Sequence, residues 1–269
     1  MRIAAVVLAL AAAASAAPAP GGVEGESPRL KSAPVVYSHE GEELTGWIVR
    51  DEARSGRRPG VLVVHEWWGL GEHAKTSAER LARMGYVALA VDMYGTGKTT
   101  KDPKQAGEWA GRFRGEGKVL GRARIRAALD VLRADPGVDP ARIGAIGFCF
   151  GGTICLELAW SGADVRGVVS FHGSLTAPTP EEAKGVKAAV LVCHGAEDAL
   201  VKPEAVEGLK KACRDASLDW TFVEYGGAVH SFTNPSADGS FNAMVKYHPL
   251  ADRRSFDHMR EFFRERFGD

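Results

Sequence analysis

The 269-residue sequence lacks several features that mark particular classes of protein. Its 34 basic residues balance 34 acidic ones, so the net charge favours neither nucleic acid nor an anionic membrane as a partner. Beyond the first 16 residues, no apolar run approaches the roughly 20 residues that a membrane-spanning helix needs. The four cysteines form no C-x-x-C pair, which disfavours a thiol-redox protein. A small molecule is therefore the expected partner.

Two partial motifs each lack a defining residue. The stretch "GTGKTTKD" at 95–102 ends like a phosphate-binding loop, but Asp92 stands five positions before Gly97, where glycine is needed. "HE" at 65–66 begins like the zinc signature H-E-x-x-H, but Gly69 replaces the second histidine, and only a distant ligand such as His73 remains. We expect no metal and no cofactor.

The first 16 residues, "MRIAAVVLALAAAASA", have the early arginine, short apolar run and small-residue end of a signal peptide. No cysteine follows that could carry a lipid anchor. Residues 17–32 are rich in Pro, Gly and Ser, which predicts a flexible leader before one domain over 33–269. We expect an exported protein, periplasmic or secreted, without a membrane anchor, as a monomer or small homo-oligomer.

An exported chain with four cysteines could form disulfides. A bridge from Cys155 to Cys193 or Cys213 is one possibility. Cys155 and Cys193 lie inside apolar runs, which favours the alternative that they are small buried hydrophobic residues.

Val-rich apolar runs alternate with amphipathic stretches along most of the chain. The runs mostly lack in/out alternation, which is typical of strands buried on both faces; they cover 60–65, 86–93, 142–148, 165–172, 188–195 and 219–226. The stretches between and after them predict helices over 74–84, 104–114, 118–134, 150–161, 203–215 and 251–266. The sequence therefore predicts an α/β fold with a mainly parallel sheet covered by helices on both faces.

Two further strand-like segments, "APVVYS" and "LTGWIV", flank "HEGEE" near the start of the domain. This spacing predicts an N-terminal antiparallel hairpin at the sheet edge. In a parallel sheet the ligand binds beyond the carboxyl ends of the strands. Residues that end a strand are therefore the candidates for function.

Gly147, Cys149 and Gly151 form the pattern G-x-C-x-G between a predicted strand and a predicted helix. This is the arrangement of a nucleophile elbow with a thiol in place of the usual hydroxyl. The turn is so tight that flanking side chains would collide, and the helix amino terminus favours a thiolate. Cys149 is therefore the candidate nucleophile, the alternative being a buried structural cysteine.

An acid and a base are expected downstream of the nucleophile, in that order. The strand at 188–195 runs into Glu197 and Asp198, either of which could be the acid, and the next strand is followed by His230. Neighbouring strand ends would let a carboxylate hold the imidazole against the thiol. In this fold the oxyanion hole is built from the backbone N–H groups of the residue after the nucleophile, Phe150, and of Trp67.

With "HEWWG", "GFCFGG", "HGAED" and "GGAVHSF" in this order, residues 33–269 resemble the dienelactone hydrolase family of α/β-hydrolases. The resemblance implies the nucleophile at Cys149, the acid at Asp198 in preference to Glu197, and the base at His230. It also implies that Glu66 contacts the resting thiol and keeps it neutral until substrate arrives. The alternative for Glu66 is a structural hydrogen-bonding residue.

The chain departs from the family pattern at Asn234. Family members that cleave dienelactone hold the substrate carboxylate with arginines, one of them four positions after the histidine, where this chain has Asn234. No clear counterpart of the second arginine appears, although Arg112 and Arg114 lie in the right segment. A neutral or aromatic ester or lactone is therefore expected, and the candidate substrate-binding residues are Trp68, Tyr94, His172 and Asn234.

The sequence thus predicts a hydrolase that cleaves a small ester or lactone through Cys149, His230 and Asp198 by way of a thioester. The alternative is a non-catalytic exported protein that uses the same scaffold to bind a small ligand. A binding protein gains nothing from keeping nucleophile, acid and base together, which favours the enzyme.

Overall fold

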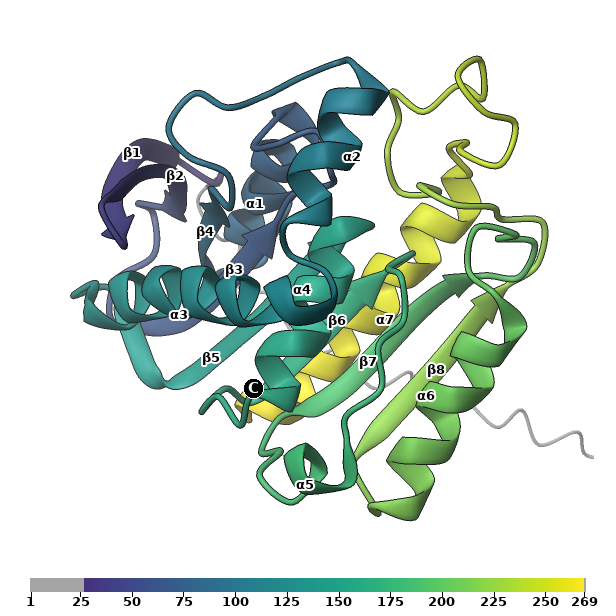
Figure 1. The fold of residues 1–269 in the computed structure, drawn as a ribbon. Helices are drawn as coiled ribbons and strands as arrows, with labels where there is room; N and C mark the ends of the chain where they lie inside the picture. Colours follow the sequence, from purple (N-terminus) through teal and green to yellow (C-terminus); the bar gives the residue numbers. More distant parts are fainter. Residues whose placement is uncertain (1–26, 269) are drawn as a thin grey trace, which may run out of the picture.

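The computed structural model describes residues 27–268, which form a single mixed sheet with helices on both faces (Figure 1). The sheet has eight strands in the order β1-β2-β4-β3-β5-β6-β7-β8. The strands are β1 (Leu30–His39), β2 (Glu42–Asp51), β3 (Arg58–Val64), β4 (Val87–Val91), β5 (Val138–Phe148), β6 (Gly167–Phe171), β7 (Ala189–Gly195) and β8 (Trp220–Tyr225). From β4 to β8 every neighbouring pair is parallel, so these strands end at the same edge of the sheet.

Two helical layers cover the sheet. The helices are α1 (Glu72–Arg83), α2 (Pro103–Gly111), α3 (Lys118–Ala134), α4 (Phe150–Trp160), α5 (Pro180–Ala183), α6 (Pro203–Asp215) and α7 (Pro249–Phe267), with a 3-10 turn at Gly115–Gly117. One core cluster joins α3, α4 and α6 to one face of the sheet, and a second joins α1 and α7 to the other. The expected fold is confirmed.

Along each central strand, successive side chains point alternately into the core on one face of the sheet and the core on the other. In β3, Leu62 and Val64 belong to one cluster, and Val61 and Val63 belong to the other. Because both faces are covered, such strands need no polar residues, which explains the unbroken apolar runs. The prediction of two buried faces is wrong for β8, where only Tyr225 is buried, because β8 is the edge strand.

The predicted hairpin is present as β1 and β2, which pair antiparallel. We expected the domain to start at residue 33. Strand β1 begins at Leu30, so the folded part starts slightly earlier. The hairpin is also tied to the sheet edge that carries the site. The Tyr37 hydroxyl donates to the Asp92 carbonyl at 2.8 Å and accepts from the Asp92 amide at 3.0 Å, just beyond the end of β4.

The six predicted helices are all observed, with ends that differ by a few residues, while α5 and the 3-10 turn were not predicted because they are too short to show a period. The predicted signal peptide and most of the predicted leader lie outside the described residues. Within residues 27–268, no helix is long and apolar enough to cross a membrane. Cys155, Cys193 and Cys213 are buried free thiols.

Candidate active site

Cys149 occupies a sharp turn between β5 and α4. Its backbone has φ 52° and ψ −114°, an unfavourable conformation for a residue with a side chain. A Cβ at Gly147 would lie 2.1 Å from the Gly151 carbonyl oxygen, and one at Gly151 would lie 2.3 Å from the Val64 carbonyl oxygen. Only glycine fits at both positions, which is the steric reason for the G-x-C-x-G pattern.

The backbone of Cys149 is held by the end of β6. Its amide donates to the Phe171 carbonyl at 3.0 Å and lies 3.2 Å from His172 Nδ1. His172 Nε2 in turn lies 2.8 Å from Thr233 Oγ1. His172 is fully buried and has φ 39°. The structure therefore places His172 beneath the turn, where it supports Cys149, and not on an open substrate surface.

The candidate acid and the candidate base meet beyond the ends of β7 and β8. His230 Nδ1 lies 2.8 Å from Asp198 Oδ2, and both residues are buried. Asp198 Oδ1 also accepts from the Leu200 amide at 3.0 Å, which fixes the carboxylate. The neighbouring Glu197 is exposed. Of the two candidate acids, Asp198 is thus the one that contacts the histidine.

The charge state of His230 is linked to Cys149. Burial alone would lower the pKa of the His230 ring, but the charge and hydrogen bonding of the Cys149 and Asp198 side chains outweigh burial and raise the pKa to about 10. With Nδ1 on Asp198, Nε2 is the nitrogen left to interact with the sulfur. His230 is thus an imidazolium that contacts Asp198 and is stabilised by the Cys149 side chain.

The two backbone N–H groups expected to form the oxyanion hole belong to Phe150 and Trp67. Phe150 is the first residue of α4, so its amide belongs to the first-turn donors that have no acceptor inside the helix. Trp67 lies in the loop after β3, and its carbonyl accepts a 3.1 Å hydrogen bond from the Tyr94 hydroxyl. Burial raises the pKa of Tyr94, so its hydroxyl stays protonated and remains a donor. Tyr94 is only 2% exposed and supports the loop from below.

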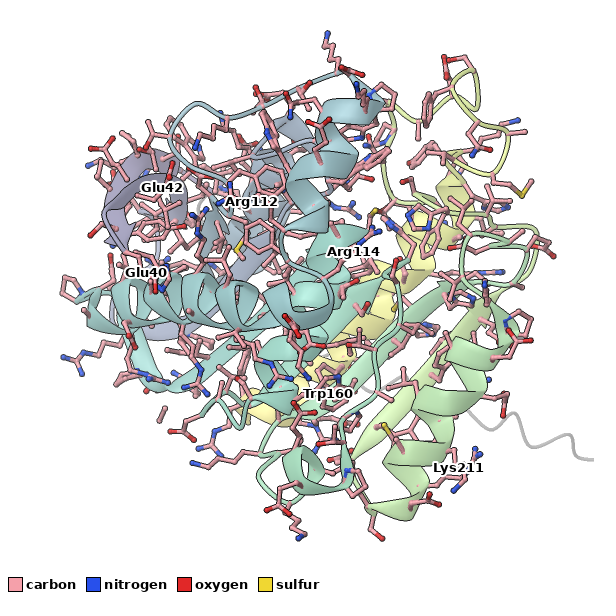
Figure 2. All side chains as sticks on the ribbon, in the orientation of Figure 1. Glu40, Glu42, Arg112, Arg114, Trp160 and Lys211 are labelled. Atoms are coloured by element: carbon pink, nitrogen blue, oxygen red, sulfur yellow. The ribbon has the colours of Figure 1, made fainter. Side chains whose placement is uncertain are left out.

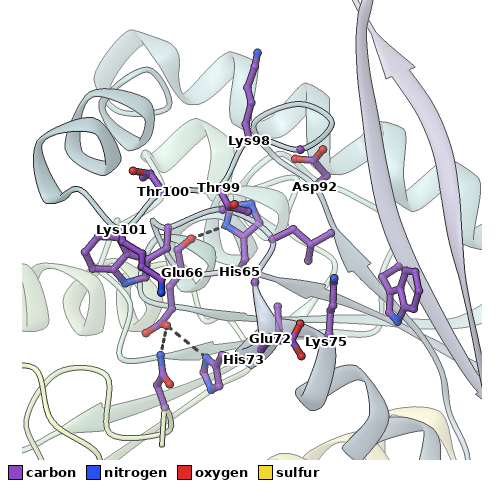
Figure 3. Close-up of a pocket in the computed structure, with 18 of the residues that line it drawn as sticks. His65, Glu66, Glu72, His73, Lys75, Asp92, Lys98, Thr99, Thr100 and Lys101 are labelled. Atoms are coloured by element: carbon purple, nitrogen blue, oxygen red, sulfur yellow. Dashed lines mark hydrogen bonds and ion pairs between the residues drawn. The ribbon is translucent and has the colours of Figure 1, made fainter. Parts of the chain in front are cut away.

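Glu66, also after β3, is buried and makes contacts on both carboxylate oxygens. Oε1 accepts from Ser231 Oγ at 2.9 Å, and Oε2 accepts from Asn234 Nδ2 at 2.5 Å. His73 Nδ1 lies 3.5 Å from Oε2 (Figure 3). Burial alone would raise the pKa of Glu66, but His73, His172 and Ser231 together lower it to about 2. These contacts differ from the thiol contact that the resemblance implies.

Two cavities open near the site. One of about 850 Å³ is lined by Glu66, Trp68 and Asn234, by His73 and by the 95–101 loop, but neither Cys149 nor His230 lines it (Figure 3). The other, of about 860 Å³, is lined by Phe150 and by Thr153 in the next turn of α4. The second cavity therefore borders the residue that follows Cys149.

The two candidate arginines lie in different surroundings (Figure 2). Arg114 lines the cavity beside Phe150, and its charge acts on Tyr94. The charge of Arg112 acts instead on Glu42, on the hairpin. Arg114 is thus the cation nearer the site, a distinction that the sequence did not give.

No group of metal-binding side chains is found within residues 27–268. His65 is itself engaged on both nitrogens: Nδ1 lies 2.5 Å from the Glu66 carbonyl oxygen, and Nε2 accepts from the Met93 amide at 3.3 Å. Burial lowers the pKa of the His65 ring, so it is neutral and serves to hold the loop.

The structure also brings in residues that the sequence did not single out. Ser231 and Thr233 follow His230, and His73, weighed only as a metal ligand, lies on α1. His73 Nε2 lies 3.1 Å from the Thr233 carbonyl oxygen. The one available signal was the short polar run "HSFTN" after the candidate base.

The chain is similar in sequence and fold to known dienelactone hydrolases. The model of the dienelactone hydrolase family matches residues 44–267. Among solved structures, one titled m3DLH is 44% identical, covers 88% of this chain and 99% of its own, and has a TM-score of 0.86. A dienelactone hydrolase-like promiscuous phosphotriesterase, P91 from metagenomic libraries, is 39% identical with a TM-score of 0.84 and covers 88% of this chain and 99% of its own.

A curated relative from Salmonella typhimurium, whose name gives it as an inferred carboxymethylenebutenolidase, is 27% identical over 83% of this chain and 83% of its own length. The family match covers both β3, which precedes Glu66, and the elbow at Cys149. The chain belongs to the dienelactone hydrolase family, and it is an ester or lactone hydrolase with the α/β-hydrolase fold.

Proposed function

We propose that the protein hydrolyses a small ester or lactone through Cys149 as nucleophile, His230 as acid and base, and Asp198 as the residue that orients His230. The observation that carries the proposal is the coupling of His230 to both partners, by the 2.8 Å contact to Asp198 and by the charge of Cys149. A thiolate is the reactive form of cysteine, and an imidazolium beside it stabilises that form.

In the first half-reaction the Cys149 thiolate attacks the carbonyl carbon of the substrate, and the ester C–O bond breaks. The oxyanion is assigned to the amides of Phe150, which follows Cys149 at the start of α4, and of Trp67, whose carbonyl is held by the Tyr94 hydroxyl. His230 enters the step protonated and gives its proton to the leaving alkoxide. The products are the alcohol and a thioester on Cys149.

In the second half-reaction the same histidine acts as a base. Once the sulfur is part of a thioester it carries no charge, so the Cys149 contribution that raises the pKa of His230 is lost and that pKa falls. His230, neutral after its proton transfer, takes a proton from water, which attacks the thioester. The acid leaves, and the thiolate and the imidazolium are restored.

The surroundings of the site favour two substrate features. The rings of Trp67, Trp68 and Phe241 form an aromatic cluster with centroid distances of 4.7 to 6.5 Å, which suits an aromatic or apolar group. Arg114 and Lys118 both line the cavity beside Phe150, and the Lys118 ammonium lies 3.1 Å from Glu182. Because Asn234 donates to Glu66 and Lys118 is paired with Glu182, Arg114 is the candidate cation for a carboxylate on the substrate.

The test is p-nitrophenyl acetate hydrolysis by the wild type and by Cys149→Ala, with Cys213→Ala as the matched control because Cys213 is a buried thiol far along the chain. Loss of the nucleophile should lower kcat by at least about 10⁴-fold, and the control should keep its activity. A stoichiometric burst of p-nitrophenol in the wild type would support the thioester. Hydrolysis by Cys149→Ala at the wild-type rate would overturn the proposal in favour of another nucleophile.

We further propose that the first 16 residues direct export, since their apolar run and small-residue end fit a signal peptide. Expression of the full chain in a Gram-negative host, followed by fractionation and N-terminal sequencing, tests this. Processed protein outside the cytoplasm supports export, and unprocessed cytoplasmic protein contradicts it.

A further inference from the structure

The carboxylate of Glu66 is held by groups from two separate parts of the chain. Ser231 and Asn234 come from the segment after His230, and His73 comes from α1. Figure 3 shows the Glu66 side chain extending from the end of β3 towards His73. Both of its oxygens therefore face donors on the side of the 850 Å³ cavity.

We propose that Ser231, Asn234 and His73 form a clamp that keeps the Glu66 carboxylate off the Cys149 sulfur, so that the nucleophile is ready before any substrate binds. These three are positioning residues, because they act through Glu66. The inference rests on the proposed function of Cys149. The resemblance implies that substrate must displace Glu66 to free the thiol. With the clamp, Cys149 is free of Glu66 before substrate binds.

The clamp is itself rigidly supported. The His73 ring packs on Phe148 with a centroid distance of 4.4 Å, and its Nε2 lies 3.1 Å from the Thr233 carbonyl oxygen. Ser231 has φ 56°, a strained conformation that the surrounding structure maintains. The backbone N–H of Asn234 donates to the Ser231 carbonyl at 2.9 Å, so the Ser231 and Asn234 side chains that hold Glu66 belong to one turn.

Leaving the clamp would be costly for Glu66. The residue is 6% exposed, so a carboxylate that gave up these donors would stay buried without an equivalent partner. Its low pKa, about 2, indicates that it is ionised throughout the working range. An ionised group near the sulfur would oppose the thiolate, and the clamp prevents that approach.

The charges around the sulfur agree with this arrangement. The charges that raise the pKa of His230 come from Cys149 and Asp198. Titratable or charged groups around Cys149 and Glu66 include His65 after β3, His73 on α1, Tyr94 after β4, His172 after β6, Asp198 after β7 and His230 after β8, and the cavity that Glu66 lines is also lined by Glu72, Asp92 and Lys101. Asp198 is the carboxylate in contact with His230, whose Nδ1 lies 2.8 Å from its Oδ2.

The experiment measures alkylation of Cys149 by iodoacetamide across pH 5 to 10, with the modified peptide identified by mass spectrometry. The other cysteines react slowly, since burial raises the pKa of the Cys193 thiol to about 12 and that of Cys213 to about 11, and raises that of Cys155 as well. The variants are Asn234→Ala, Ser231→Ala and Glu66→Gln, together with the double variants that combine each of the first two with Glu66→Gln. Thermal unfolding of each variant verifies that it is folded.

If the clamp operates, Asn234→Ala frees Glu66 to approach the sulfur. Alkylation at pH 7 should fall about tenfold, and its rise should move to higher pH. Adding Glu66→Gln should restore the rate to within about twofold of the wild type, because the repelling charge is gone. Glu66→Gln alone should alkylate at the wild-type rate. Ser231→Ala should show the same pattern with a smaller effect.

Two results would overturn the clamp. An equal loss of alkylation with and without Glu66→Gln would mean that Asn234 acts only as a structural residue. Faster alkylation in Glu66→Gln alone would mean that Glu66 restrains the thiol in the resting protein. Neither result bears on whether Cys149 is the nucleophile, which the hydrolysis assay with Cys149→Ala decides separately.

Discussion

The elbow and the 226–248 segment, which runs between β8 and α7, meet at the same site but are built by different means. The elbow is positioned by sterics, because two glycines allow Cys149 to stand between a strand and a helix. The 226–248 segment contains no named helix or strand among the described residues. Its backbone is held by long-range bonds, among them His230 N–H to the Met244 carbonyl and Lys246 N–H to the His230 carbonyl, both 3.0 Å.

The position of Cys149 and the surroundings of Cys149 should therefore respond differently to mutation. At the elbow a single added Cβ would overlap backbone atoms, so the glycines there tolerate almost no substitution. The 226–248 segment distributes its restraint over many hydrogen bonds, so single changes there should move the chemistry in smaller steps. The variants below are arranged to break or refine this contrast, beginning with the largest effect.

Gly151→Ala should be the most damaging change. The new Cβ would lie 2.3 Å from the Val64 carbonyl oxygen, in the backbone of the central strand, and backbone cannot move aside easily. We expect a loss of more than about 4 kcal/mol in unfolding free energy, measured by urea denaturation. The control is Gly208→Ala in α6, where a Cβ meets nothing within 4 Å and should stabilise the helix by up to about 1 kcal/mol. Equal stability of both variants would contradict the steric account.

Asp198→Asn should keep the fold but impair the chemistry. The amide cannot balance the imidazolium and can present its NH₂ group to His230 Nδ1, so the ring loses its orientation. We expect kcat for p-nitrophenyl acetate to fall about 10³-fold. Glu197→Gln is the matched control, because Glu197 is exposed and adjacent, and it should be close to wild type. A similar loss of kcat in both variants would mean that Asp198 and Glu197 do not differ in their roles.

Titration of His230 should depend on the sulfur. Burial lowers its pKa, and the Cys149 charge and Asp198 outweigh burial and raise it from 6.5 to about 10. A raised pKa in the folded state stabilises the protein fully below about pH 6.5, and this contribution is lost as the pH rises through about 10. In Cys149→Ser the ring should titrate at lower pH, followed by ¹⁵N NMR of the imidazole. The same midpoint in both proteins would mean that the sulfur carries no charge.

Arg114→Ala should affect acidic substrates selectively. Arg114 lines the cavity beside Phe150, so its loss should raise KM about tenfold for an ester that bears a free carboxylate. KM for the matched neutral ester should stay the same. Arg112→Ala serves as the control, since the charge of Arg112 acts on Glu42. If both variants behave alike, Arg114 has no special role in binding.

Phe241→Ala should have the smallest effect. Phe241 is 57% exposed and packs on Trp67 and Trp68, so its removal takes away part of an aromatic surface. We expect KM for naphthyl acetate to rise about threefold and KM for ethyl acetate to stay constant. Val119→Ala, on the exposed face of α3, is the control. An equal change for both esters would argue against an aromatic subsite.

The sequence predicted the fold because its signals are local and repeated. The apolar runs of the buried strands and the helical stretches between them required no knowledge of distant contacts, and α3 was predicted over 118–134, the range observed. The elbow could be predicted in the same way, since its glycines stand two positions before and after Cys149. The exception was β8, whose place at the edge is a property of the sheet order and not of its own residues.

The surroundings of the site could not be predicted in the same way. His73 and Glu66 are close in sequence, but the donors Ser231 and Asn234 are more than 160 positions away from Glu66. Nothing in "HSFTN" indicates which side chain turns towards β3. Likewise, His172 and Tyr94 were expected to bind substrate, and the structure places both beneath the site, where they hold Cys149 and Trp67. Such roles depend on which loops meet in space.

The bond between Tyr37 and Asp92 connects the hairpin to the reaction chemistry. Asp92 Oδ1 accepts from the amides of Tyr94 and Gly95, and the Tyr94 hydroxyl supports the Trp67 carbonyl. Removal of β1 would therefore take away the Tyr37 anchor of Asp92 and loosen the loop that carries Trp67, although β1 lies far from Cys149 in the chain.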